Sequence, residues 1–163
     1  MKYCYTETPI GPLLIAGDDQ SIHLIAFPKH GKPQKPEAGW TESMSGPLAE
    51  SVRQLREYFA GKRKDFDLPL APEGTEFQRK VWRTLQEIPY GETISYGELA
   101  KRVGNPRASR AVGSANGKNR IPIVIPCHRV IAGDGGLGGF GGGLTTKEKL
   151  LAIEKAPLAK AAS

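Results

Sequence analysis

The sequence has little cysteine and no long hydrophobic run. Its 163 residues include only two cysteines, Cys4 and Cys127, so we expect no disulfide framework. No stretch approaches the roughly 20 consecutive apolar residues that a membrane-spanning helix needs. The first residues also lack the apolar core of a signal peptide. These absences predict a cytoplasmic protein in a reducing compartment, with no membrane partner.

Acidic residues are scarce in the C-terminal half. Residues 75–163 hold 14 Lys and Arg against 7 Asp and Glu, whereas residues 1–74 hold 9 against 10. Residues 101–120 contain six basic side chains and no acid. This asymmetry indicates a polyanion such as nucleic acid as the partner of the C-terminal half. A basic face that is merely solvated is the alternative that charge alone leaves open.

The N-terminal half has the pattern of a small α+β domain. Residues 2–8, 13–16 and 21–27 are rich in β-branched and aromatic residues and are separated by turn residues, which predicts three strands. Residues 28–46 have loop composition. Gly46 is a candidate N-cap with Pro47 at the first helical position, and a helix should follow and end at Gly61. Residues 61–74 resemble a linker, which marks a domain boundary.

Helix start signals dominate the next stretch. Thr75 and Gln78 form a predicted capping box at the start of a helix whose apolar face begins with Phe77. Ser95 and Glu98 form another, before a short helix that ends at Gly104. A further helix is predicted over residues 107–117 after Asn105-Pro106. Two short helices joined this closely are typical of a helix-turn-helix.

The second helix of this pair is almost bare, because small residues fill most of its positions. A major-groove recognition helix normally carries long polar side chains, whereas a bare one suits close approach to a narrow groove with little sequence preference. A small-residue helix packed in a core is the alternative, although its arginines argue against full burial.

The segment 121–130 carries the most informative chemistry. Its β-branched residues and two prolines predict a buried strand or extended segment that leads into Cys127, His128 and Arg129. A cation or a histidine beside a thiol lowers its pKa, which favours nucleophilic chemistry. A structural cysteine is the common alternative. A metal site is a weaker one, because zinc wants about four ligands.

The last helix is predicted to start with a capping box at Thr145 and Glu148. Glu154 lies four residues after Leu150 and shares its inward face, so this carboxylate needs a buried partner. His128 is the candidate partner, which makes Cys127, His128 and Glu154 a nucleophile, a base and an orienting group. A cysteine hydrolase could use the same set. The glycine-rich residues 133–143 suggest a pocket wall or, alternatively, a flexible linker.

Four motifs follow one another along the second half of the chain: Ile94 to Leu99, Asn105-Pro106 followed by Arg110 to Gly113, Asn119, and Pro126 to Val130. In these motifs and their order, the chain resembles the O6-alkylguanine-DNA alkyltransferases. The resemblance implies an α+β fold in which residues 1–70 form a ribonuclease-H-like support domain, a small antiparallel sheet with a helix. A mostly helical winged-helix-type domain over 75–157 would carry the helix-turn-helix and the reaction, followed by a tail over 158–163.

The resemblance implies that Cys127 accepts the alkyl group from O6-alkylguanine, and from O4-alkylthymine, in double-stranded DNA after the base has been flipped out. His128 would take the thiol proton, Glu154 would orient His128, Tyr96 would contact the base and Asn119 would brace the site. The substrate pocket would be lined by Val130, Phe140, Gly141 and Gly142. The residues expected at the DNA are Arg110, which would fill the vacated stack, and Arg107, Ala111, Ser114, Lys101, Lys118 and Arg120.

The family pattern is not met everywhere. Phe140 stands where many relatives have tyrosine, so one hydroxyl in the pocket is missing. Only Cys4 and His23 match the ligands with which some relatives bind zinc, so we expect no metal and no cofactor. The product would be a stable thioether, so each protein molecule should react once. We also expect the protein to be a monomer. A lesion sensor, a helix-turn-helix regulator and a hydrolase are the alternatives; related sensors carry tryptophan in place of Cys127.

Overall fold

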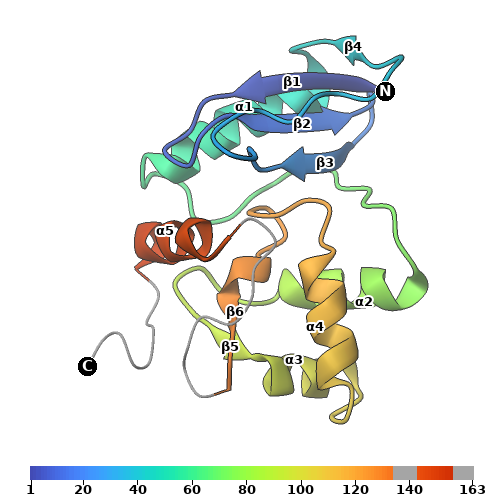
Figure 1. Ribbon diagram of the computed structural model, residues 1–163, viewed down its shortest axis with the longest axis vertical. Helices are drawn as coiled ribbons and strands as arrows, with labels where there is room; N and C mark the ends of the chain where they lie inside the picture. The colour runs from blue at the N-terminus through green and yellow to red at the C-terminus, as the bar shows by residue number, and fades with distance from the viewer. Residues whose placement is uncertain (134–142, 156–163) are drawn as a thin grey trace. The chain divides into compact units, whose positions relative to one another are not determined.

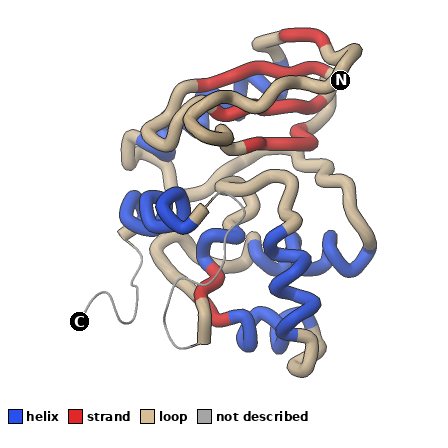
Figure 2. Tube along the Cα trace, viewed as in Figure 1, coloured by secondary structure: helices blue, strands red, loops and turns tan. Residues whose placement is uncertain are grey.

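A computed structural model of the protein describes residues 1–133 and 143–155, which belong to two compact units. The first unit is Met1–Glu73 and the second begins at Gly74. The first holds a sheet and a helix, and the second is mostly helical (Figures 1 and 2). No helix within the described ranges is long and apolar enough to cross a membrane.

The first unit is built on a four-stranded sheet. Its strands are β1 (Lys2–Thr6), β2 (Leu13–Gly17), β3 (Ile22–Ala26) and β4 (Thr41–Glu42), in the order β3-β2-β1-β4. The first three pair antiparallel, as expected, but β4 is parallel to β1. The prediction of loop throughout residues 28–46 was therefore wrong at β4. A strand of two residues is too short to show an alternation of apolar and polar side chains. Only its pairing with the edge of β1 defines β4 as a strand.

Helix α1 (Gly46–Phe59) lies against one face of this sheet (Figure 1). Pro47 lies in its first turn as predicted, because its missing N–H needs no partner there. The N-cap, however, is the extended Ser45 and not Gly46. The inward stripe includes Leu48, Leu55 and Tyr58, all buried. Their burial against the sheet closes the core of the first unit.

Three helices form the core of the second unit: α2 (Glu76–Leu85), α3 (Tyr96–Val103) and α4 (Ser109–Gly117) (Figure 1). The capping box of Thr75 and Gln78 is present, and Ser95 accepts a hydrogen bond from the backbone of Glu98. Helix α4 begins two residues later than predicted. Phe77 was expected in the inward stripe of α2, but it is 37% exposed.

The segment 121–130 is buried throughout, as predicted, but most of it is not a strand. Ile125 donates its N–H to the carbonyl of Ile121 and closes a turn, within which Ile123 has a φ of 76°. Pro122 inside this turn and Pro126 directly after it cannot donate to a ladder, which explains why no strand continues. After the turn come the 3₁₀ helix η1 (Cys127–Arg129) and strand β6 (Val130–Ile131), which pairs parallel with β5 (Ile94–Ser95).

Helix α5 (Leu144–Glu154) packs against η1. Its N-cap is Gly143, without a side-chain hydrogen bond, so the capping box predicted at Thr145 and Glu148 was wrong. Both residues lie inside the helix, because it starts one residue before Thr145. The pocket residues Phe140, Gly141 and Gly142 lie outside the described residues, as do most of the glycine-rich segment and the predicted tail.

Candidate active site

The thiol of Cys127 is held in the interior of the second unit. It opens η1 between the turn at residues 121–125 and strand β6, and only 4% of the residue is exposed. Its backbone N–H donates to the carbonyl of Ile125 at 2.8 Å. The nucleophile predicted from the sequence is thus fixed by backbone hydrogen bonds and by packing, and it depends on neighbouring groups for activation.

The predicted pairing of His128 with Glu154 is present. His128 Nε2 lies 2.7 Å from Glu154 Oε2, and both side chains are fully buried. Arg129 joins the same carboxylate, with Nε donating to Oε1 at 2.8 Å, and its Nη1 donates to the carbonyl of Ile88 at 2.7 Å. The carboxylate is therefore clamped between an imidazole and a guanidinium, which satisfies the buried charges.

This network fixes the protonation states of its members. The hydrogen bonds from His128 and Arg129 outweigh burial and hold the pKa of Glu154 at about 2, so the carboxylate is ionised at neutral pH. Burial lowers the pKa of His128 below its ordinary value, although Glu154 opposes this shift. The imidazole is therefore neutral. Because Nε2 faces an anion, Nε2 carries the proton and Nδ1 keeps a lone pair.

The expectation of a lowered thiol pKa was wrong. Burial raises the pKa of Cys127 to about 11, and the side chain of Asn119 and the charge of Lys147 offset only part of this effect. The guanidinium of Arg129, which the sequence places two residues away, instead binds Glu154 and the carbonyl of Ile88. The resting group is consequently a neutral thiol, and a base must remove its proton before it attacks.

Two asparagines, one at the end of α4 and one just after it, form hydrogen bonds with the segment 121–127. Asn119 donates to the carbonyl of Ile125 at 2.7 Å and accepts from the N–H of Ile121 at 2.9 Å, so it spans the buried turn. Asn116, on α4, donates to the carbonyl of Cys127 at 3.3 Å. Sequence reasoning missed Asn116, although it lies four residues after buried Val112 and so belongs to the inward face of α4.

Tyr96 begins α3 and contacts α4. A Cβ added to Gly113 would lie 3.7 Å from a ring carbon of Tyr96, an ordinary van der Waals distance, so α4 passes close to the tyrosine ring at this residue. Burial raises the pKa of Tyr96, the nearby Cys127 adds to this effect, and the Asn116 side chain opposes it. The hydroxyl therefore stays protonated at neutral pH and remains a hydrogen-bond donor.

Lys147 is a second group that the sequence reasoning did not assign to the site. It is fully buried on α5, and its Nζ donates to the carbonyl of Val130 at 2.7 Å. Burial lowers its pKa to about 8. The spacing argument that identified Glu154 also applies here, because Lys147 precedes Leu150 by three residues and Leu151 by four.

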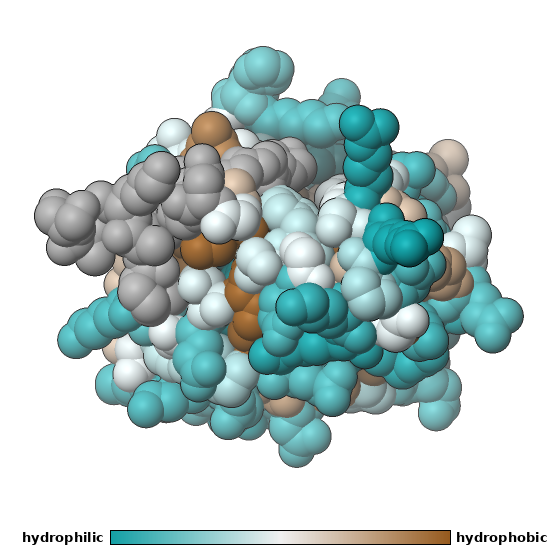
Figure 3. Space-filling view, turned by 90° about the horizontal axis from the view of Figure 1, so that it is seen from below, coloured by the Kyte–Doolittle hydropathy of each residue, from teal (hydrophilic) through white to brown (hydrophobic). Residues whose placement is uncertain are grey.

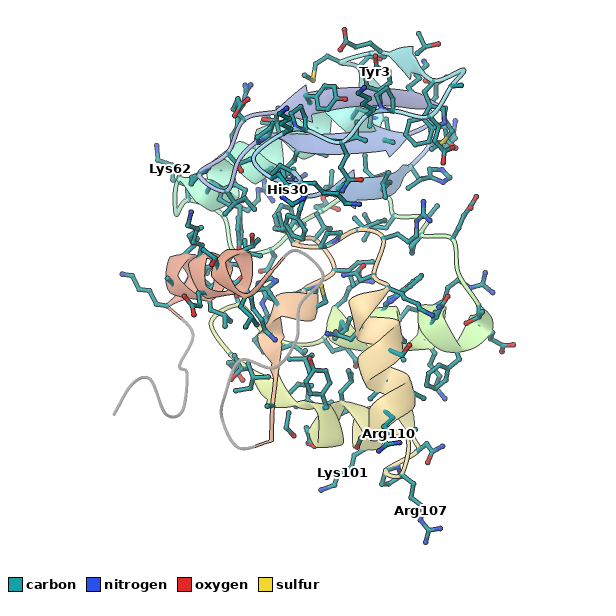
Figure 4. The ribbon with its side chains drawn as sticks, in the orientation of Figure 1. Tyr3, His30, Lys62, Lys101, Arg107 and Arg110 are labelled. Atoms are coloured by element: carbon teal, nitrogen blue, oxygen red, sulfur yellow. The ribbon has the colours of Figure 1, made fainter. Side chains whose placement is uncertain are left out.

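The side chains expected to contact DNA are all exposed, on α3, on α4 and on the segments that flank α4. These residues are Lys101, Arg107, Arg110, Ala111, Ser114, Lys118 and Arg120. In Figure 4, Lys101, Arg107 and Arg110 lie at the end of the unit where α3 turns into α4, and Lys101 and Arg107 point away from the ribbon. Viewed from that end, the described surface is mostly hydrophilic, with small apolar areas between the polar side chains (Figure 3).

Only one of the four predicted pocket residues is described. Val130 is buried and directly follows η1, whereas the other three predicted lining residues are not described. Among residues 1–133 and 143–155, no group of three or more His, Cys, Asp or Glu side chains is arranged to hold a metal ion. His23, one of the two residues compared with zinc ligands, instead pairs with Asp18 at 2.9 Å.

Comparisons with known proteins agree with this arrangement. Residues 76–156 match the family model described as 6-O-methylguanine DNA methyltransferase, DNA binding domain, and residues 1–72 match the ribonuclease-like domain of the same protein. A methylated-DNA–protein-cysteine methyltransferase of Methanosarcina acetivorans is 53% identical over 94% of this chain and 98% of its own length.

A relative of the same name from Mycolicibacterium paratuberculosis is 50% identical over 95% of this chain and 93% of its own length. The crystal structure of Mycobacterium tuberculosis OGT in complex with DNA superposes with a TM-score of 0.88 at 45% identity, covering 96% of each chain. Both domains and nearly the full length are thus shared with these relatives. The chain belongs to the 6-O-methylguanine DNA methyltransferase family.

Proposed function

We propose that this protein repairs double-stranded DNA by transferring the alkyl group of O6-alkylguanine to the sulfur of Cys127. The observation that carries the proposal is the buried chain of Arg129, Glu154 and His128 beside a buried thiol. A thiol whose pKa is raised to about 11 needs a base, and the neutral imidazole next to it in sequence is one. Family membership supplies the substrate class.

The proton follows a path set by the hydrogen bonds of His128. Its Nε2 is engaged by Glu154, and its buried Nδ1 has no hydrogen-bond partner among the described residues. We assign Nδ1 as the atom that accepts the thiol proton, through a bridging water molecule. Glu154 stabilises the imidazolium that forms, and Arg129 holds the carboxylate in place. His128 and Glu154 thus act as the base and the orienting group.

The reaction is a single in-line displacement. A bond forms between the sulfur of Cys127 and the alkyl carbon, while the bond from that carbon to O6 of guanine breaks. The electron pair leaves with the base, which takes up a proton and becomes ordinary guanine. The hydroxyl of Tyr96, kept protonated by its raised pKa, hydrogen-bonds the base and helps deliver this proton. O4-alkylthymine is a second substrate of the same class.

The alkylated atom lies within the duplex, so the base must leave the stack before it reaches a buried thiol. The exposed cations on and around α3 and α4 bind phosphates without reading sequence, and Arg110 fills the space that the base vacates. The bare surface of α4, with Ala111 and Ser114 exposed, lets the helix approach a narrow groove closely. The site thus combines backbone binding with extraction of the base.

The thioether product contains no easy leaving group, so each molecule reacts once and needs no cofactor. We expect it to act as a monomer, because every group assigned to the reaction comes from one chain. A free thiol nucleophile also suits a reducing compartment such as the cytoplasm. Both cysteines of the protein are free.

The test is the mass of the protein after it is mixed with excess duplex DNA that contains O6-methylguanine. We expect a gain of one methyl group per molecule, located on the peptide that holds Cys127, and no gain for Cys127→Ala. Cys4→Ala is the matched control and should gain the same mass as the unmodified protein. Continued turnover would instead identify a hydrolase, and binding without a mass gain would identify a lesion sensor.

A further inference from the structure

The loop of residues 86–93, which joins α2 to β5, lies against the end of α5 (Figure 1). It contains a tight turn, in which the N–H of Glu92 donates to the carbonyl of Pro89 at 3.1 Å. Gly91 has a φ of 84° at the third position of this turn, where a type II turn requires a positive φ. A Cβ added to Gly91 would lie 3.4 Å from the backbone oxygen of Glu154. The loop backbone therefore closely approaches the last residue of α5.

The ring of Tyr90, inside this turn, contacts the guanidinium of Arg129. The Cζ atom of Arg129 lies over the ring at 5.8 Å from its centroid, which is within the range of a cation–π interaction. The carbonyl of Ile88 accepts a hydrogen bond from Nη1 of the same guanidinium at 2.7 Å. Because Arg129 is buried, water hardly weakens these contacts. The loop thus holds the guanidinium through both a ring and a carbonyl group.

The hydroxyl of Tyr90 reaches the helix that carries the partner of Arg129. It donates to the carbonyl of Ile153 at 3.2 Å. Glu154 is the last residue of α5, and the carbonyl groups in the last turn of a helix have no partner within the helix. Burial and the charge of Glu154 raise the pKa of Tyr90, so its hydroxyl is protonated at neutral pH and can donate. One side chain therefore holds both the guanidinium and the helix end from which the carboxylate projects.

The position of the Glu154 carboxylate determines how the imidazole of His128 is oriented. Glu154 Oε2 lies 2.7 Å from His128 Nε2 and also accepts from Arg129 Nη2 at 3.1 Å. A shift of the guanidinium, or of the last turn of α5, would therefore move the oxygen that orients the imidazole. Small errors in the position of a reacting group slow a reaction strongly, even when they originate away from the chemistry. Tyr90 contacts both of the elements that fix this oxygen.

We propose that Tyr90 is a positioning residue for alkyl transfer: its ring holds Arg129 and its hydroxyl holds the last turn of α5. This inference rests on the proposed function, in which Glu154 orients the base. Tyr90 acts through Arg129 and Glu154 and does not touch the substrate. Its loss therefore slows the chemical step and leaves the binding of DNA as it is.

The test measures single-turnover transfer from O6-methylguanine in duplex DNA over a series of DNA concentrations, which gives the maximum rate and the half-saturating concentration separately. Tyr90→Leu removes the ring and the hydroxyl, and its maximum rate should fall about ten-fold at an unchanged half-saturating concentration. Tyr90→Phe keeps the ring, so it should recover most of the rate and remain about two- to three-fold slow for the lost hydrogen bond. An unchanged maximum rate in either variant would overturn the inference, and so would a change confined to the half-saturating concentration.

Tyr5→Leu is the matched control, because the hydroxyl of Tyr5 also donates to a backbone carbonyl, that of Gln34 at 2.7 Å, but in the first unit. It should keep the maximum rate of the unmodified protein. Equal slowing by the two leucine variants would show that the rate follows overall stability, which would overturn the inference. If Tyr90→Leu failed to fold, the rate of Tyr90→Phe would decide by itself. Failure of the proposed function is a separate result, namely no mass gain from O6-methylguanine in the unmodified protein.

Discussion

The two units contain the same kinds of reactive groups, yet only one arranges them as a site. Each holds one buried cysteine, Cys4 in the first and Cys127 in the second. Each also holds a histidine paired with a carboxylate, at 2.9 Å for His23 and Asp18 and at 2.7 Å for His128 and Glu154. Burial raises the pKa of both thiols to about 11. Neither composition nor thiol acidity separates the two units.

The difference lies in connectivity and burial. In the first unit, strand β2 lies between Cys4 on β1 and His23 on β3, and the Asp18 side chain is 47% exposed. In the second unit, Cys127 and His128 are consecutive in η1, and the histidine pair is fully buried. Because the base is anchored at one nitrogen and follows the thiol directly in the same short helix, we assign Cys127, and not Cys4, as the nucleophile.

The largest expected effect comes from removing the charge of the buried carboxylate, Glu154. Glu154→Gln leaves the buried guanidinium of Arg129 without its counter-ion, so we expect the free energy of unfolding to fall by about 3–5 kcal/mol. The rate of methyl transfer should fall by about 100-fold or more, since His128 loses its orienting group. Denaturant unfolding and single-turnover kinetics measure the two effects.

Asp18→Asn is the matched change in the first unit. It neutralises a carboxylate that also has a pKa of about 2 and a histidine partner, but one that water surrounds. Solvent screens such a pair, so stability and transfer should hardly change. Equal losses in the two variants would show that burial is not what separates the two pairs.

Local signals in the sequence predicted much of the second unit. Ser95 caps α3 because a hydroxyl satisfies an orphan N–H whatever the rest of the fold does. Glu154 was placed opposite His128 because a carboxylate on an apolar stripe needs a partner, and Glu154 lies on the α5 face that meets η1. Rules based on spacing within one helix therefore transferred directly to the structure.

Properties that depend on distant partners were not predictable in this way. The direction of the Cys127 pKa shift depends on how completely the thiol is enclosed, which no neighbour in sequence determines. The partner of Arg129 includes the carbonyl of Ile88, more than forty residues away. Phe77 was assigned to the buried face of α2 because helical spacing shows which residues share a face but not how far burial extends around the helix. Strand β4 was missed because it forms only through its pairing with β1.

The pH dependence of transfer tests whether His128 is the base. Its pKa is lowered by burial, so the neutral form persists to a lower pH than in an ordinary histidine. We expect the single-turnover rate to be flat from about pH 8 to about pH 6.5. Below the pKa of His128 it should fall about ten-fold for each further pH unit, because the imidazole gains a proton and can no longer accept one.

The profile of Asp18→Asn should coincide with that of the unmodified protein, because its histidine lies in the other unit and takes no part. A decline that begins above pH 6.5, the ordinary pKa of histidine, would contradict the assignment. The ionisation would then belong to a group whose pKa is raised, which His128 is not.

The smallest expected effect concerns the charges nearest the two thiols. Lys147 lowers the pKa of Cys127, whereas Glu42 raises that of Cys4. Lys147→Met, made in a Cys4→Ala protein, should therefore raise the thiol pKa and slow alkylation by iodoacetamide about two- to five-fold at mildly alkaline pH. Glu42→Gln, made in a Cys127→Ala protein, should lower the thiol pKa and speed alkylation by a similar factor.

The opposite signs make this pair informative. Lys147 also donates to the carbonyl of Val130, so its loss has a structural consequence as well as an electrostatic one. If loosening of η1 and β6 outweighed the lost charge, Cys127 would become more accessible and its alkylation would speed up. Slower alkylation, with a shift of the pH–rate curve to higher pH, would show that the buried cation acts on the sulfur through its charge, and that only the second unit offsets the burial of its cysteine in this way.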